Sequence, residues 1–409
     1  MMNMTHREEA MIDRPLYLDW LGRWRDKDVI KVIVGMRRCG KSTVLKLFSE
    51  KLVTQGVDLD SIISINFEKL DEAYPTTPEE LYRYIAERLR PGKNYVFLDE
   101  VQHVRDFERV VDGLFVRDDV DLYITGSNAF FLSGELATLL TGRYVELRVL
   151  PLSFAEYHSA NPDESPDAAF NRYLAHGGLP YTLEIERPND IADYLGGVFN
   201  TIIVKDIAAR NPRMDMGAFS NVAAFLADNV GNLTSLQKIS RGLAAHGRKA
   251  STSTVGTYVE ALRSSYLLYE ARRYDIHGKQ HLDTLGKYYL GDLGLRFWLL
   301  GRDQGDVGHR VENVVYLELL NRYRNVSVGT MRNGEIDFVA VDARGPRYYQ
   351  VALTVLDSAT LERELAPLRA VKDNYPKTLL TLDRIGASDH GGIEQKNLVD
   401  WLLEPTGGR

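Results

Sequence analysis

The chain has 409 residues, of which 44% are hydrophobic and 26% are charged, with 33 glycines and 14 prolines. This ordinary composition excludes a disordered, collagen-like or low-complexity protein and predicts two or three domains. The net charge of −7 excludes a strongly basic nucleic-acid-binding protein, although residues 205–310 taken alone carry 15 Lys and Arg against 10 Asp and Glu.

The N-terminal residues have no apolar core of signal-peptide length, and no apolar run in the chain is long enough to span a membrane. The one cysteine, Cys39, excludes an intramolecular disulfide and a cysteine-based zinc site. We therefore expect a cytoplasmic protein with no membrane partner.

An apolar strand, a glycine-bounded loop and a helix are predicted in that order over residues 28–48. The loop satisfies the P-loop pattern, in which backbone amides and a helix N-terminus converge on phosphate oxygens. Lys41 is expected to meet the β- and γ-phosphates, and Ser42 to place its hydroxyl on Mg²⁺. The predicted phosphate-binding residues are Gly35, Met36, Arg37, Arg38, Cys39, Gly40, Lys41, Ser42 and Thr43.

Cys39 lies inside this loop, and two interpretations of it stay open. The phosphate-binding amides and Lys41 create a positive site that would lower the pKa of the thiol. The other interpretation is a small residue that the loop tolerates.

A strand over 61–67, a helix over 79–89 and a strand over 94–100 follow the P-loop. The last strand ends in Asp99 and Glu100, a pair that would usually be a solvated strand end. After a P-loop the pair favours another interpretation, in which Asp99 binds Mg²⁺ or its waters and Glu100 orients the attacking water. The alternation of strands and helices predicts an α/β fold with a largely parallel sheet.

Polar residues also follow the next strand, over 121–125. Ser127 or Asn128 is the candidate that holds the nucleophilic water. Arg143 precedes a further strand over 144–149, and its guanidinium would neutralise charge on a transferred phosphoryl group. It would act in cis or on a neighbouring subunit of a homo-oligomer, and the alternative is an ordinary surface arginine.

The runs RPLYLDWL, GMRRCGKSTVLKL, FLDEVQHVRDFERVV and ITGSNAFFLSGELATLLTGRYVELRVLPLSFAEY resemble the prokaryotic, archaeal-type ATPases of the AAA superfamily. The resemblance implies ATP as ligand, Mg²⁺ as metal, and an AAA-type P-loop ATPase domain over residues 1–158. It further implies connecting helices over 159–215, a winged-helix domain over 216–305 and a restriction-endonuclease-like α/β domain over 306–409.

Residues 218–274 themselves predict three helices and a hairpin, the order of a winged helix. The third helix would then enter a DNA major groove, and the alternative is a protein-docking domain or a lid on the ATPase. Candidate base contacts are Ser253, Thr254, Thr257 and Tyr258. Candidate phosphate contacts are Arg248, Lys249, Arg263, Arg272 and Arg273.

Residues 309–382 predict an αβββαβ order, which resembles the PD-(D/E)xK nuclease core. The resemblance implies a metal site with Glu312, or alternatively Glu318, on the helix and Asp337 on the second strand. Gln350 and Ala352 stand where the third strand should carry an acid and a lysine. We therefore expect a degenerate site without cleavage activity, unless Lys372 or Lys377 replaces the missing lysine.

These patterns together predict an Mg²⁺-dependent ATPase with a DNA-associated role. Two alternatives stay open, a nucleotide-switched DNA-binding regulator with slow hydrolysis and an ATP-regulated nuclease.

Overall fold

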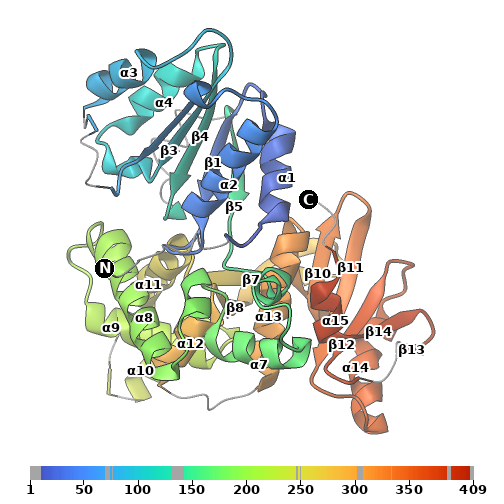
Figure 1. Ribbon diagram of the computed structural model, residues 1–409. Coiled ribbons are helices and arrows are strands. Elements are labelled where there is room, and N and C mark those ends of the chain that lie inside the picture. The colour runs from blue at the N-terminus through green and yellow to red at the C-terminus, as the bar shows by residue number, and fades with distance from the viewer. Residues whose placement is uncertain are drawn as a thin grey trace, which may run out of the picture.

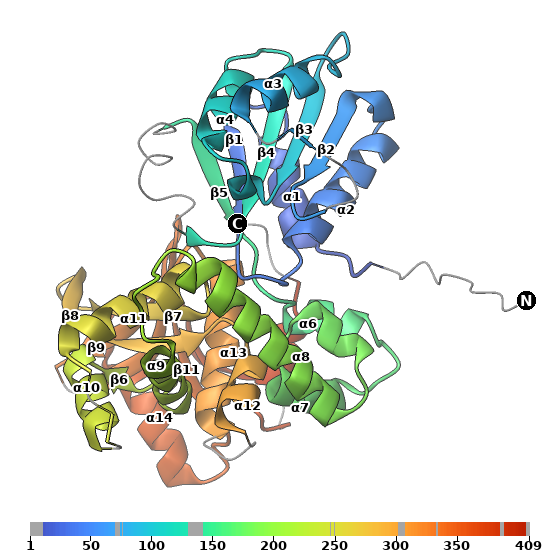
Figure 2. The ribbon, with the colours of Figure 1, turned by 90° about the vertical axis from the view of Figure 1, so that its left-hand side faces the viewer.

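A computed structural model describes residues 11–69, 74–75, 77–129, 142–245, 247–248, 250–301, 307–332, 334–384 and 388–405, with the backbone alone at 283 and 284. Lys249, a candidate phosphate contact, lies outside the described residues. So do residues 130–141, which belong to the last of the four runs that resemble AAA-superfamily ATPases. Figures 1 and 2 show a smaller N-terminal layer built on one sheet, which stands above a larger body of helices and a second sheet.

The N-terminal sheet has five strands in the order β2-β3-β4-β1-β5, and every pairing is parallel. The strands are β1 (Ile30–Val34), β2 (Ile62–Asn66), β3 (Asn94–Asp99), β4 (Val120–Gly126) and β5 (Tyr144–Arg148). All residues of β1, β3 and β4 are buried, as expected for a parallel sheet covered on both faces. The predicted α/β fold with a parallel sheet is therefore confirmed.

Among the described residues, this sheet is accompanied by the helices α1 (Pro15–Trp24), α2 (Lys41–Thr54), α3 (Pro78–Ala86) and α4 (Phe107–Phe115). Helix α1 packs beside α2, and α3 packs beside α4 (Figure 1). Because the strands are parallel, the loops that follow β1, β2, β3 and β4 all leave the sheet at the same edge.

A group of helices lies below this sheet (Figure 2). It comprises α6 (Phe154–Ser159), α7 (Pro166–His176), the 3-10 turn Pro180–Glu184, and α8 (Pro188–Thr201), which continues as a π-helical segment over Ile202–Ala208. Helix α12 (Leu293–Leu300) packs against α7 and α8. A Cβ on Gly196 of α8 would lie 2.4 Å from Nε1 of Trp298, so glycine permits this close packing.

Three more helices follow, α9 (Met216–Asp228), α10 (Leu236–Ala245) and α11 (Thr252–Ser264). The Ser251 hydroxyl accepts a hydrogen bond from the Thr254 amide and caps α11, as its sequence position predicts. Tyr258 is buried and its ring packs against Phe219, with centroids 6.1 Å apart. The expectation that Tyr258 contacts DNA bases is therefore wrong, because the side chain belongs to the core.

The second sheet has nine strands in the order β13-β14-β12-β11-β10-β9-β7-β8-β6. They are β6 (Leu233–Thr234), β7 (Leu268–Asp275), β8 (Gln280–Leu290), β9 (Asn325–Met331), β10 (Gly334–Asp342), β11 (Gly345–Ala352), β12 (Lys377–Thr381), β13 (Ser388–Asp389) and β14 (Ile393–Asn397). The helices α13 (Val307–Arg322), α14 (Ser358–Ala370) and α15 (Leu398–Leu403) accompany them. Strand β7 pairs in parallel with β9, so one sheet runs across the boundary expected at residues 305 and 306.

Among the residues that the structure describes, no helix combines the length and the apolar character that crossing a bilayer would need.

Candidate functional site

The loop after β1 wraps around the start of α2 and holds Lys41 at its centre. Gly40 precedes the helix with φ 100°, and Gly35 has φ 155°. A Cβ on Gly35 would lie 2.2 Å from the carbonyl oxygen of Val149, so glycine is required there. Lys41 Nζ donates to the Gly35 carbonyl at 3.1 Å and lies 3.4 Å from Oε1 of Glu100. The loop therefore combines amides of a helix N-terminus with one buried ammonium group, which suits bound phosphates.

Asp99 ends β3 directly beside this loop. Its Oδ1 accepts from the Thr125 hydroxyl at 2.6 Å, and its Oδ2 accepts from Asn66 Nδ2 at 2.7 Å. Burial raises the pKa of Asp99, and hydrogen bonds from Ser42 and Thr125 oppose that rise. Because the Ser42 hydroxyl and the Asp99 carboxylate meet here, the hard oxygen donors that Mg²⁺ requires are present together.

Glu100 is fixed at the next position by an unusual backbone conformation. It has φ 55°, in the left-handed region, and its amide donates to the Thr125 hydroxyl at 2.8 Å. Its carboxylate accepts from Nε2 of Gln102 and faces Lys41. The structure thus brings together Lys41, Asp99 and Glu100, as the motifs predict.

Ser127 and Asn128 follow β4 and point away from the sheet towards the π-helical segment. The Ser127 hydroxyl donates to Oδ1 of Asp206 at 3.3 Å, and Asn128 Nδ2 donates to the backbone carbonyl of Asp206 at 3.3 Å. Arg37 of the P-loop donates from Nε and Nη2 to the same carboxylate at 3.2 Å. Sequence reasoning missed Asp206, because no motif marks a residue so far along the chain from the P-loop.

The structure rules out one of the expected roles of Arg143 and one of those of Cys39. Val34 pairs with Arg148, so Arg143 precedes β5 at the opposite edge of the sheet, where its Nη1 bonds Oδ1 of Asp112 at 2.6 Å. Arg143 therefore lies too far from the P-loop to contact a nucleotide bound by the same chain. Burial raises the pKa of the Cys39 thiol, which donates to the Val149 carbonyl at 3.3 Å. Cys39 is therefore a packed residue of the loop.

A cleft of about 690 Å³ separates the P-loop from the helical group below. Figure 2 shows α8 running beneath the N-terminal sheet. The P-loop side of the cleft carries Arg37, Arg38, Gly40, Lys41, Ser42 and Thr43, and the opposite side carries Pro180, Tyr181, Glu184, Tyr194, Gly197, Val198 and Thr201. The rings of Tyr181 and Tyr194 are 5.0 Å apart, and burial raises the pKa of Tyr194 to about 12 against the opposing charge of Arg38.

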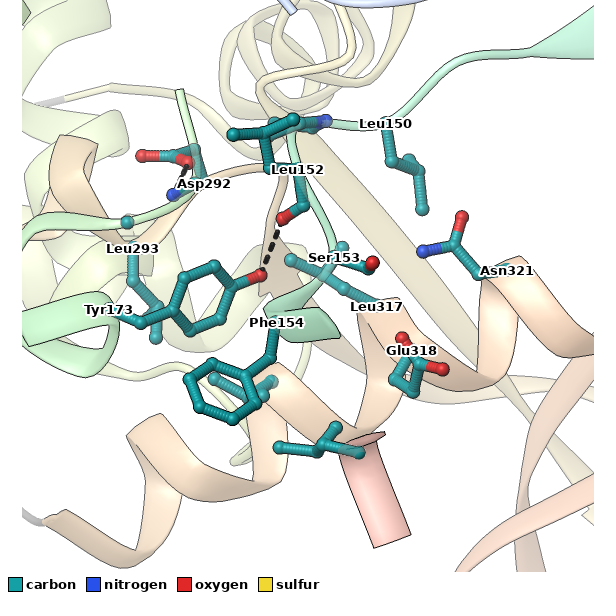
Figure 3. A pocket seen from close by; sticks show the side chains of 15 residues that line it. Leu150, Leu152, Ser153, Phe154, Tyr173, Asp292, Leu293, Leu317, Glu318 and Asn321 are labelled. Atoms are coloured by element: carbon teal, nitrogen blue, oxygen red, sulfur yellow. Dashed lines mark hydrogen bonds between the residues drawn. The ribbon is translucent and has the colours of Figure 1, made fainter. Parts of the chain in front are cut away.

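A smaller hollow lies where residues 150–154, which follow β5, meet helices α7, α12 and α13 (Figure 3). The Tyr173 hydroxyl donates to the Leu152 carbonyl at 2.8 Å, and Asp292 accepts from the amides of Gly178 at 2.7 Å and Gly294 at 2.8 Å. Burial raises the pKa of Asp292 to about 6. The hollow measures about 10 Å³, which is room for about one water. The hydrogen bonds hold the surrounding backbone in place, and the hollow is too small for a ligand.

The C-terminal residues Glu312 and Asp337 lie around one buried ammonium group, that of Lys287 on β8, and Gln350 contacts Asp337. Lys287 Nζ lies 3.0 Å from Oε1 of Glu312, 2.8 Å from Oε1 of Glu335 and 3.7 Å from Oδ1 of Asp337. Asp337 Oδ2 accepts from the amide of Val351 at 2.9 Å, and its own amide donates to Oε1 of Gln350 at 3.4 Å. The sequence pattern missed Lys287 because it precedes the expected nuclease-like region.

The other lysines proposed for this cluster lie elsewhere. Lys377 pairs with Asp373 at 3.3 Å, and Lys372 is exposed. Glu318, the alternative helix acid, pairs with Arg322 at 2.7 Å. Within the described residues, no group of three or more His, Cys, Asp or Glu side chains has an arrangement that could hold a metal ion.

Two protein families match successive parts of the chain, which together make up most of it. A family described as an AAA domain matches residues 27–158, and a domain of unknown function matches residues 167–306. The second match spans both the connecting helices and the three-helix segment that follows them.

Two uncharacterised proteins are similar over most of the chain. One from Haemophilus influenzae is 38% identical over 402 residues, which are 97% of this chain and 100% of the relative. One from Methanocaldococcus jannaschii is 27% identical over 370 residues, which are 84% of this chain and 79% of that protein.

Solved structures show weaker similarity. The Walker-type ATPase PABY2304 of Pyrococcus abyssi has a TM-score of 0.49 at 16% identity, with 72% of this chain and 97% of that chain covered. The Aeropyrum pernix ORC1 protein, solved in complex with DNA, has a TM-score of 0.31 at 14% identity, with 71% and 93% covered.

Proposed function

Because the chain belongs to the same family as the Haemophilus influenzae protein and carries an AAA domain, we propose that it is an Mg²⁺-dependent ATPase. The observation that carries the proposal is the assembly of Lys41, Ser42, Asp99 and Glu100 at one edge of the sheet, beside a cleft of about 690 Å³. Hydrolysis would be coupled to movement of the helices on the other side of that cleft.

The residues have distinct roles in this proposal. The P-loop amides and Lys41 bind the phosphates of ATP, and Ser42 and Asp99 would hold Mg²⁺. When bound, the metal neutralises charge on the phosphate oxygens. Glu100 accepts a proton from a water molecule while the oxygen of that water bonds to the γ-phosphorus. The bond between the γ-phosphorus and the β–γ bridging oxygen breaks, which releases ADP and phosphate.

The far side of the cleft is suited to the nucleoside. Tyr181 and Tyr194 supply aromatic faces on which a purine can stack. A nucleotide in the cleft would thus contact both the AAA domain and the helical group. Through these contacts, nucleotide binding can be coupled directly to movement of the helical group.

Calorimetric titration with Mg²⁺ and ATP tests the binding step. Lys41→Ala should abolish binding because it removes the buried ammonium group that faces the phosphates. Lys46→Ala is the matched control, since Lys46 is exposed on the same helix. Equal ATP affinities in the parent and Lys41→Ala would refute the site.

A second candidate function is a nucleotide-switched regulator that binds DNA through a winged helix. It is supported by helices α9, α10 and α11 followed by the hairpin β7–β8, in a segment with 15 basic and 10 acidic residues. Phosphate contacts would give a negative slope of log K against log salt. Absence of duplex binding at ~50 mM salt would rule this function out.

We do not expect nuclease activity, even though Glu312 and Asp337 share one cluster. Gln350 gives a metal no negative charge, and Ala352 leaves the third strand without a lysine. Lys287 supplies an ammonium group but is already paired with Glu312 and Glu335. Intact plasmid after incubation with Mg²⁺ or Mn²⁺ and ATP is the expected result.

A further inference from the structure

Asp206 lies in the π-helical segment and forms hydrogen bonds both to the P-loop and to residues that follow β4. Its carboxylate receives two hydrogen bonds from Arg37 and one from Ser127, and its carbonyl receives one from Asn128. Arg37, Ser127 and Asn128 are all buried. A single carboxylate of the helical group therefore holds donors from two loops of the AAA domain.

Arg37 has carboxylates on both sides of its guanidinium. Nε and Nη2 face Asp206, and Nη1 donates to Glu68. Arg37 and Glu68 also line the cleft that holds Lys41 and Ser42. A γ-phosphate that reaches this side of the cleft must compete with these carboxylates for the guanidinium.

The segment that contains Asp206 is connected to the rest of the helical group. It continues α8, whose Tyr194, Val198 and Thr201 line the cleft. On its other side α8 packs against α12, where the rings of Phe199 and Trp298 have centroids 4.9 Å apart. π-Helical turns are often found at functional positions.

We propose that Asp206 is a positioning residue that makes the helical group respond to the γ-phosphate. Without ATP it holds Arg37 and Ser127. Bound ATP draws these donors to its γ-phosphate and releases the π-helical segment, whereas ADP does not. The inference rests on the proposed ATPase function, and it assigns the coupling to one carboxylate.

The first test compares the dissociation constants of ADP and a non-hydrolysable ATP analogue. Asp206→Asn removes the charge that competes with the γ-phosphate, so it should tighten analogue binding by at least ~5-fold and leave ADP binding unchanged. A merely structural role would weaken both or change neither. Asp193→Asn, an exposed carboxylate on α8, is the matched control and should behave as the parent.

The outcomes separate the two proposals. Parent protein that binds neither nucleotide contradicts the proposed function itself. Parent that binds both, with the same ADP-to-analogue ratio in Asp206→Asn, overturns the role of Asp206 alone.

Hydrogen exchange in the parent gives a second test that needs no variant. Amides of residues 202–208 should exchange at least ~5-fold faster with the ATP analogue than with ADP, because the contact to Asp206 is lost. Equal exchange with the two ligands, at saturating concentrations, overturns the proposal even if Asp206→Asn fails to fold.

Discussion

Asp292 is a buried carboxylate whose burial raises its pKa from 3.8 to about 6. Between these values the unfolded chain releases the proton and the folded chain keeps it, so the free energy of unfolding falls as pH rises. Above pH 6 this contribution is constant. We expect the difference in unfolding free energy between the parent and Asp292→Asn to fall by up to ~3 kcal/mol across this interval.

Urea unfolding at several pH values measures that difference. Asp193→Asn, which changes an exposed carboxylate, is the control. A parent-minus-Asp292→Asn difference that does not vary between pH 3.8 and about 6 would contradict the assignment.

The residues of the proposed nucleotide site differ in how far the sequence could predict them. Lys41 and Ser42 are adjacent in one loop, and Asp99 and Glu100 are adjacent at one strand end, so local patterns were sufficient. Asp206 meets Arg37 across 169 positions of sequence. Neither partner carries a motif that points to the other, because the contact depends on how α8 docks beneath the sheet.

At the scale of elements, Lys287 links strand β8 to helix α13 and strand β10. Glu312, Asp337 and Glu335 surround its buried ammonium group, and the first two carboxylates help to raise the pKa of Lys287. Lys287→Met leaves these carboxylates without their shared cation. The free energy of unfolding at pH 7 should therefore fall by ~3 kcal/mol.

Two comparisons give this prediction its controls. Lys372→Met changes an exposed lysine and should alter stability by less than ~0.5 kcal/mol. Glu312→Gln added to Lys287→Met should recover part of the loss, because it removes a buried negative charge that the lysine no longer balances. Equal stability of Lys287→Met and the parent would show that the cluster needs no cation.

The order of elements was easier to predict than their pairing. The αβββαβ order predicted over residues 309–382 is observed as α13, β9, β10, β11, α14 and β12. The pairing of β7 with β9 was not predicted, because side-chain alternation within a strand does not identify its neighbour in the sheet. That pairing joins segments that were expected to be separate domains.

At the scale of the whole molecule, the position of Arg143 decides how it can act. It lies at the edge of the sheet opposite the P-loop, so it can reach a nucleotide only on another subunit. If it does so, light scattering should show oligomers with ATP. Arg143→Ala should lower the rate of hydrolysis by ~10³-fold without weakening ATP binding.

Arg105→Ala, at a highly exposed position, is the control for Arg143→Ala. A protein that stays monomeric with ATP, and hydrolyses it equally well with alanine at position 143, leaves Arg143 as a surface residue paired with Asp112.

In the proposed mechanism, Glu100 activates water at a nucleotide held by the P-loop. The most direct measurement is steady-state phosphate release from ATP and Mg²⁺ by the parent and by Glu100→Gln, each with and without single- or double-stranded DNA. We predict turnover by the parent and a loss of at least ~10²-fold in Glu100→Gln, with ATP binding retained. Stimulation of the parent by DNA would support the DNA-associated role. Hydrolysis by Glu100→Gln at the parent rate would contradict this role of Glu100.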